Sequence, residues 1–240
     1  MAKNLFRRFT LALAFGLFGL LLFPSVNNFT PAYAIDQTLH SVDDADSLWV
    51  VVNKTRPLNP LQYKPQDLVS VGSAGINLNP YGKKLRKDAA TAAVELAKAL
   101  SRAGKGKLII QSAYRSFNEQ KTVHDRQVSK YGLKAGEALA ARPGYSEHQT
   151  GLAMDVSARS QGCQIRVCFG QTKAGSWLAA NAYKYGFIVR YQKAATRVTG
   201  YQYEPWHLRY VGIDAATEMH DKAIHTLEQY FKLPSAPNYP

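Results

Sequence analysis

Two short segments of this 240-residue chain combine side chains that are able to bind a metal ion and to move a proton. The first reads SEHQTGLAMD and contains His148 and Asp155, and the second reads EPWHLRY and contains Glu204 and His207. A catalytic zinc site uses three protein ligands and leaves a fourth position for water. It also uses a carboxylate outside the metal shell as general base. The two segments therefore predict metal-assisted hydrolysis.

The spacing within each segment assigns a role to each of these four side chains. His148 and Asp155 are seven positions apart with Gly151 between them, so a turn that leads into a strand can bring both to one ion. The proline between Glu204 and His207 disfavours a regular helix, so this site differs from the helical H-E-x-x-H type. Asp155 lies in an apolar run, where a buried carboxylate is costly unless it is paired or bound to a cation. We predict Glu204 as the proton-transfer residue and three zinc ligands: His148, Asp155 and His207.

Together with a third segment, these motifs resemble the zinc D-alanyl-D-alanine carboxypeptidases of the VanY type. The three motifs are S-A-Y-R-S at residues 112–116, S-x-H-x-x-G-x-A-x-D at 146–155 and E-P-W-H-x-R-Y at 204–210. A glutamine, Gln120, follows the arginine of the first motif by five residues, and the segment from Val52 to Val69 is also similar to that family. The resemblance covers about residues 48–211.

The resemblance implies site residues that agree with the roles predicted from spacing. It implies zinc binding by the two histidines and the aspartate, and base catalysis by Glu204. It places Arg115 next to the substrate, where a fixed guanidinium can stabilise a developing oxyanion. It implies substrate contacts at Gln120, Ser146 and Tyr191. The remaining histidines fit no ligand spacing and are predicted to lie at the surface: His40, His124, His220 and His225.

The implied activity is removal of the terminal D-alanine from peptidoglycan stem peptides, with D,D-carboxypeptidase activity favoured. An L,D-carboxypeptidase or a peptidoglycan endopeptidase would use the same zinc site, so the motifs leave these alternatives open. A cell-wall-binding protein without catalysis is an alternative of a different class. Its sequence would lack Glu204 or a ligand, and this chain retains all of them.

The elements that must position these residues alternate irregularly between helices and short strands. We expect helices over 83–103, 118–131, 175–185 and 214–231, and strands over 107–111, 152–156, 187–191 and 206–211. The order lacks the regular rhythm of βαβ units, so it predicts a compact α+β domain with a small, mainly antiparallel sheet flanked by helices. The predicted organisation is a signal peptide (1–34), a linker (35–47), the zinc carboxypeptidase domain (48–233) and a C-terminal tail (234–240).

The N-terminus has the pattern of an export signal. Lys3, Arg7 and Arg8 precede an apolar stretch over 9–23, and the sequence Ala-Tyr-Ala ends at Ala34 as a small-x-small cleavage site. The apolar stretch is shorter than the roughly 20 residues of a spanning helix. We therefore expect an exported protein, extracellular, periplasmic or associated with the cell wall, with no stable membrane span after cleavage.

Charge and cysteine content are consistent with export. The formal net charge is +13, and removal of the three positive leader residues leaves +10. Such a charge either attracts anionic wall polymers or serves solubility alone. The basic residues are dispersed without a recognisable reading element, which argues against nucleic acid as a partner. Cys163 and Cys168 are the two cysteines, and in an exported chain they favour a disulfide, with two buried thiols as the alternative.

Overall fold

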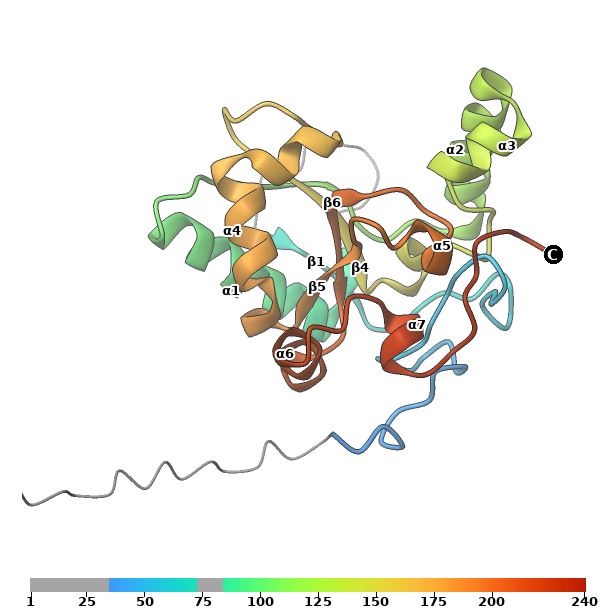
Figure 1. Cartoon of the computed structure of the whole chain (residues 1–240), viewed down its shortest axis with the longest axis horizontal. Coiled ribbons are helices and arrows are strands. Elements are labelled where there is room, and N and C mark those ends of the chain that lie inside the picture. Colours follow the sequence, from blue (N-terminus) through green and yellow to red (C-terminus); the bar gives the residue numbers. More distant parts are fainter. Residues whose placement is uncertain (1–34, 73–83) are drawn as a thin grey trace, which may run out of the picture. The chain divides into compact units, whose positions relative to one another are not determined.

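A four-stranded antiparallel sheet lies at the centre of the domain (Figure 1). The computed structural model describes residues 35–72 and 84–240, so the predicted signal peptide lies outside the described residues. The strand order is β3-β4-β6-β5, and each neighbouring pair is antiparallel. The strands are β3 (Leu108–Ser112), β4 (Ala153–Ala158), β5 (Phe187–Tyr191) and β6 (Glu204–Tyr210). The predicted α+β fold with a small antiparallel sheet is confirmed.

The register of this sheet places several predicted site residues opposite one another on neighbouring strands. Asp155 of β4 pairs with Ser112 of β3 on one side and with His207 of β6 on the other. Tyr191 of β5 pairs with Glu204 of β6, beyond a shift in the register of these two strands. Residues directly opposite each other on neighbouring strands lie within a few ångströms, about 4.5–5.5 Å apart at Cβ. Strand pairing alone therefore gathers residues from four distant parts of the sequence.

Two helices on one side of the sheet supply much of the apolar core. They are α1 (Lys87–Arg102) and α4 (Lys173–Asn181), which Figure 1 shows side by side. Leu96 and Leu100 of α1 and Leu178 of α4 are fully buried in this core. Alanines at helical spacing on α1 allow the helix to approach the strands closely. Buried leucines of this kind contribute about 1.5–3 kcal/mol each relative to exposed ones.

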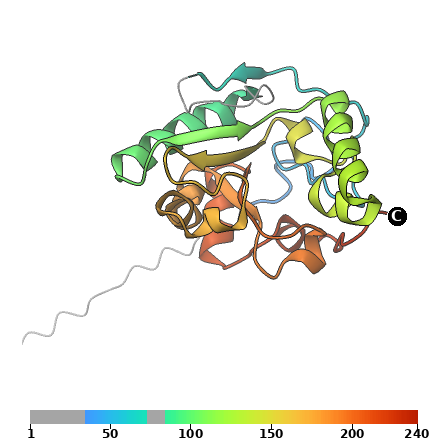
Figure 2. The same cartoon turned by 90° about the horizontal axis from the view of Figure 1, so that it is seen from above.

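A pair of helices lies on the opposite side of the sheet from α1 and α4 (Figures 1 and 2). These are α2 (Phe117–Tyr131) and α3 (Leu133–Leu139). Helix α2 begins with a capping box in which Ser116 and Glu119 each accept a backbone N–H of the first turn. Gly136 permits the close approach of α3, because a Cβ built there would lie 2.7 Å from Val128 Cα.

Three helix predictions need correction at their ends or in their interior. The helix expected over 83–103 begins at Lys87, because Lys84–Arg86 forms β2 and pairs with β1 (Leu68–Ser70). The helix expected over 175–185 changes after Asn181 to a 3-10 turn, η4 (Ala182–Tyr185). The continuous helix predicted over 214–231 is wrong. It divides into α6 (Ile213–Asp221) and α7 (Leu227–Tyr230), since Ala223 has a φ of 52° and Thr226 caps a new helix.

Residues 48–52, called the N-terminal strap below, form an apolar segment that is largely buried without forming a strand. Trp49 and Val51 pack against Val211, Met219 and Leu227 in a second apolar cluster. The indole Nε1 of Trp49 donates to the carbonyl of Val211 at 2.9 Å. The N-terminal strap is therefore held against β6 and α6.

Smaller elements complete the described part of the chain. They are the 3-10 turns η2 (Glu147–Thr150) and η3 (Val167–Gln171), and the short helix α5 (Thr196–Thr199). Cys163, which precedes η3, forms a disulfide with Cys168, which lies within η3. Closing so short a loop contributes about 2 kcal/mol in the chain-entropy account. Within residues 35–72 and 84–240, no helix combines the length and hydropathy needed to cross a membrane.

Candidate metal centre and active site

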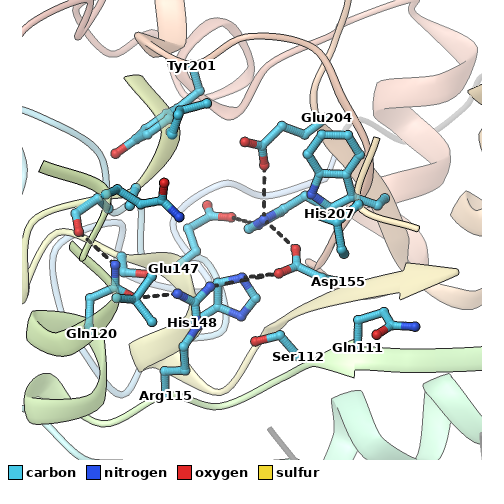
Figure 3. A pocket seen from close by; sticks show the side chains of 18 of the residues that line it. Gln111, Ser112, Arg115, Gln120, Glu147, His148, Asp155, Tyr201, Glu204 and His207 are labelled. Carbon is cyan, nitrogen blue, oxygen red and sulfur yellow. Dashed lines mark hydrogen bonds and ion pairs between the residues drawn. The ribbon is translucent and has the colours of Figure 1, made fainter. Parts of the chain in front are cut away.

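His148, Asp155 and His207 form a cluster at the middle of the sheet (Figure 3). One potential ligand atom from each lies within 4.8 Å of the others. His148 belongs to η2, a turn that ends at Gly151 with a φ of 69°. Only glycine adopts this conformation readily, and a Cβ there would also lie 2.9 Å from a side-chain carbon of Leu68. This turn ends just before β4 begins, and it places His148 close to Asp155.

The hydrogen bonds of the two histidines leave one nitrogen of each facing Asp155. His148 Nδ1 lies 2.7 Å from the carbonyl oxygen of Ala113, so we assign the proton to Nδ1. Its Nε2 then faces Asp155 Oδ2 at 3.2 Å. His207 has the reverse arrangement: Nε2 lies 3.2 Å from Glu147 Oε2, and Nδ1 lies 3.3 Å from Asp155 Oδ1.

This cluster fits a divalent cation. His148 Nε2 and Asp155 Oδ1 are both buried, and neither forms a hydrogen bond despite the close neighbours. Buried polar atoms without a partner are costly, and each one calls for an explanation. Two imidazole nitrogens and a carboxylate that converge in this way match the ligand set of catalytic zinc sites.

Glu204 lies next to the cluster without belonging to it. Its Oε2 is 3.7 Å from His207 Nδ1, and its carboxylate faces the same pocket (Figure 3). Burial raises the pKa of Glu204 to about 7, although the neighbouring His207 opposes the rise. A carboxylate with a pKa near neutrality is well matched to accepting and returning a proton.

Arg115 enters the pocket from the segment that follows β3. Its Nη1 donates to Gln120 Oε1 at 2.8 Å, and Gln120 in turn donates from Nε2 to the carbonyl of Ala141 at 2.7 Å. Its Nη2 lies 3.8 Å from Asp155 Oδ2, and its Nε is buried without a hydrogen-bond partner. The guanidinium is therefore held in place with donor capacity left for a ligand.

The structure places every sequence-predicted site residue in a single pocket. They are Arg115, Gln120, Ser146, His148, Asp155, Tyr191, Glu204 and His207. Trp206 and Tyr201 complete the wall near Glu204, and Arg126 and Leu139 line the part formed by α2 and α3.

The prediction that the four remaining histidines lie at the surface is wrong for one of them. His124 is half-buried and its Nε2 has no hydrogen-bond partner, because α3 packs over it with Glu137 at 3.7 Å.

One buried residue next to the metal cluster, Glu147, was not predicted from the sequence; it precedes His148, and its side chain is fully buried. Its Oε1 accepts hydrogen bonds from Arg190 Nε at 2.8 Å and from Arg209 Nη1 at 2.9 Å. Burial alone would raise the pKa of Glu147, but the two guanidiniums outweigh it and hold the pKa well below its ordinary value. The signal was present in the sequence: both arginines lie in apolar strand segments, where a buried cation requires an acidic partner.

The chain is similar in sequence and in structure to known carboxypeptidases. The model of the family described as "VanY: D-alanyl-D-alanine carboxypeptidase" matches residues 82–213. The chain is 42% identical to the putative carboxypeptidase YodJ of Bacillus subtilis (strain 168), over 81% of this chain and 70% of that protein. Among solved structures, that of the LdcB LD-carboxypeptidase has a TM-score of 0.72 at 42% identity, covering 80% of this chain and 88% of the other. A mutant of the vancomycin resistance D,D-pentapeptidase VanY in complex with Zn(II) has a TM-score of 0.62 at 30% identity, covering 76% and 97%.

Proposed function

The chain belongs to the VanY family of D-alanyl-D-alanine carboxypeptidases, and from that premise we propose that it is a zinc-dependent enzyme that removes the terminal D-alanine from peptidoglycan stem peptides. One observation carries the proposal. The cluster of His148, Asp155 and His207 shares its pocket with a half-buried carboxylate at Glu204 and a fixed guanidinium at Arg115. Metal ligands, a base and an oxyanion donor are the complete set of groups that amide hydrolysis by this route requires.

Zinc is the metal that the ligand set supports, because two imidazoles and a carboxylate are typical of its catalytic sites. A Zn2+ ion held by His148, Asp155 and His207 would supply a Lewis acid that polarises the scissile carbonyl and lowers the pKa of water. The mutant VanY structure with Zn(II), to which this chain is similar, supports the same choice.

The other side chains would then perform the proton transfer and the charge stabilisation. Glu204 takes a proton from the attacking water and returns it to the amine of the departing D-alanine. Arg115, held by Gln120, donates to the oxygen that becomes negative in the transition state. Ser146 and Tyr191 contact the peptide from the remaining walls of the pocket.

Two bonds of the stem peptide are candidates for cleavage. The resemblance to the VanY type favours D,D cleavage, which acts on pentapeptide stems that end in two D-alanines. The chain also has a higher identity and TM-score to the LdcB LD-carboxypeptidase, 42% and 0.72, than to the VanY D,D-pentapeptidase, 30% and 0.62. That difference supports L,D cleavage of tetrapeptide stems as the second candidate.

Release of free D-alanine tests the proposal directly. Purified pentapeptide and tetrapeptide stems are incubated separately with the zinc-loaded protein, with and without a chelator, and free D-alanine is quantified. We expect release that the chelator abolishes and that added zinc restores, with the preferred stem identifying the bond. Absence of release from both stems by zinc-loaded protein would contradict the carboxypeptidase proposal and leave an endopeptidase or a wall-binding protein.

Replacement of Arg115 by lysine should lower kcat/KM by about 10²- to 10³-fold, the usual effect of removing an oxyanion donor. Lysine keeps the charge but loses the planar fork that reaches both Gln120 and the pocket. Steady-state kinetics on the preferred stem measure the effect, and zinc content should be unchanged. Arg102→Lys, the same change at the exposed end of α1 and outside the pocket, is the matched control and should have native kinetics. Equal kinetics for the Arg115 variant and the native protein would remove Arg115 from the mechanism.

We further propose that residues 1–34 direct export and that the basic mature chain associates with anionic wall polymers. The domain would then extend over residues 48–233, between the linker (35–47) and the tail (234–240). The mass of the protein recovered outside the cell membrane should correspond to a chain that begins at Ile35. A protein that retains the leader and stays in the cytoplasm would contradict this proposal.

A further inference from the structure

Glu147 links the metal cluster to a buried network of charges. One carboxylate oxygen faces His207 Nε2 at 3.2 Å (Figure 3), and the other accepts hydrogen bonds from Arg190 and Arg209. The side chain is fully buried, yet Glu147 lies outside the group of side chains that could hold a metal ion. Its side chain faces one member of the cluster, His207, at hydrogen-bond distance.

The outer part of this network fixes the position of the carboxylate. Arg190 makes two hydrogen bonds to Glu228, Nη1 to Oε2 at 2.9 Å and Nη2 to Oε1 at 2.7 Å. Asn53 Nδ2 donates to the same carboxylate at 3.0 Å. Arg209 Nη2 donates to two backbone carbonyls of the N-terminal strap, those of Leu48 at 3.0 Å and Val50 at 2.8 Å. Both arginines are therefore anchored away from the site, on α7 and on the strap.

The charges of this network balance without the metal. Two carboxylates, Glu147 and Glu228, face two guanidiniums, Arg190 and Arg209, and all four side chains are essentially unexposed. Two guanidinium N–H groups hold the Glu147 carboxylate in place, so it acts as a fixed acceptor toward His207. The other histidine of the cluster has a neutral acceptor instead, the carbonyl of Ala113.

We propose that Glu147 is a positioning residue that holds the Nε2–H of His207 and thereby directs His207 Nδ1 toward the metal. A carboxylate that accepts from a metal-binding imidazole fixes the tautomer and the ring orientation, and it makes the ligand more basic. This inference rests on the zinc site of the proposed function and assigns His207 a different binding nitrogen from His148. The two histidines therefore bind one ion through opposite nitrogens, Nδ1 of His207 and Nε2 of His148.

Zinc affinity measured without turnover tests the role of Glu147. Glu147→Gln should weaken zinc binding by about 10- to 100-fold in competition with a chromophoric chelator, as is typical for outer-shell partners. The visible absorption of the cobalt-substituted variant should differ from that of the native protein, which a purely structural role would not change. Glu147→Asp keeps the charge but withdraws it from His207, so it should also weaken binding.

Glu228→Gln is the matched control, because it removes the other buried carboxylate of the network without touching His207. It should lower the unfolding temperature as much as Glu147→Gln and leave zinc affinity and the cobalt spectrum unchanged. Equal losses of zinc affinity in the two variants, or no loss in Glu147→Gln, would overturn the inference. Failure of the native protein to bind zinc would instead contradict the proposed function.

The ring nitrogen through which each histidine binds zinc can also be determined in the native protein, so the result does not depend on whether a variant folds. Nitrogen-15 NMR of the histidines in the zinc-loaded chain should show one imidazole bound through Nδ1 and one bound through Nε2. Two histidines bound through the same nitrogen would overturn the inference.

Discussion

Replacement of Glu204 by glutamine should lower kcat by about 10²- to 10⁴-fold, the contribution expected of a general acid–base residue. Glutamine has nearly the same size and keeps an oxygen in the pocket, but its amide cannot accept the proton of the attacking water. The variant should still bind zinc, because Glu204 lies outside the ligand group of His148, Asp155 and His207. Its KM should change little, since the substitution removes an interaction made mainly in the transition state.

Stability and metal content separate this result from a folding defect. Burial raises the pKa of Glu204 to about 7, so the neutral glutamine removes a costly charge and should not destabilise the fold. Glu95→Gln, the same chemical change on an exposed part of α1, is the control and should have native kinetics. A Glu204→Gln enzyme with native kcat would exclude Glu204 as the base and direct attention to another carboxylate in the pocket.

The fold could be predicted from the sequence where local pattern and tertiary structure agree. The strand predicted over 187–191 coincides with β5, and the helix predicted over 118–131 differs from α2 by a single residue. The long C-terminal helix could not be predicted correctly, because apolar residues keep a helical spacing through its break. The break depends on the positive φ of Ala223 and on the cap at Thr226, and neither interrupts the hydrophobic pattern.

The site was predictable for a different reason: its chemistry is concentrated in short motifs. His148 and Asp155 lie in one segment and Glu204 and His207 in another, so spacing alone identified all four. The Glu147 network could not be derived in the same way. The other members of the network, Arg190, Arg209 and Glu228, lie 43 to 81 positions further along the chain than Glu147, and only the packed sheet shows which acid pairs with which base.

Replacement of Arg190 by methionine should lower the free energy of unfolding by about 3–5 kcal/mol, the usual cost of breaking a buried ion pair by removing one partner. Arg190 is fully buried and is the cation that Glu147 and Glu228 share. Without it, both carboxylates stay in the interior with fewer donors. Equilibrium unfolding in urea measures the loss. Lys98→Met, which breaks the exposed pair with Glu95, should change stability by no more than about 1 kcal/mol.

The pH dependence of this loss distinguishes unpaired charge from lost packing. Burial alone would raise the pKa of Glu228, but Arg190 lowers it below its ordinary value of 4.5. In the native protein this carboxylate therefore stabilises the fold above pH 4.5, and the stabilisation is lost as the pH falls further. In Arg190→Met the pKa of Glu228 should instead rise, so its protonation removes the buried unpaired charge. The difference in the free energy of unfolding between the two proteins should therefore shrink in acid.

A double-mutant cycle gives a second test. Adding Glu228→Gln to Arg190→Met should lower the free energy of unfolding by less than Glu228→Gln does in the native protein, because the carboxylate it removes has already lost its cation. A loss that is independent of pH and strictly additive would mean that Arg190 acts through packing volume and that its charge contributes little.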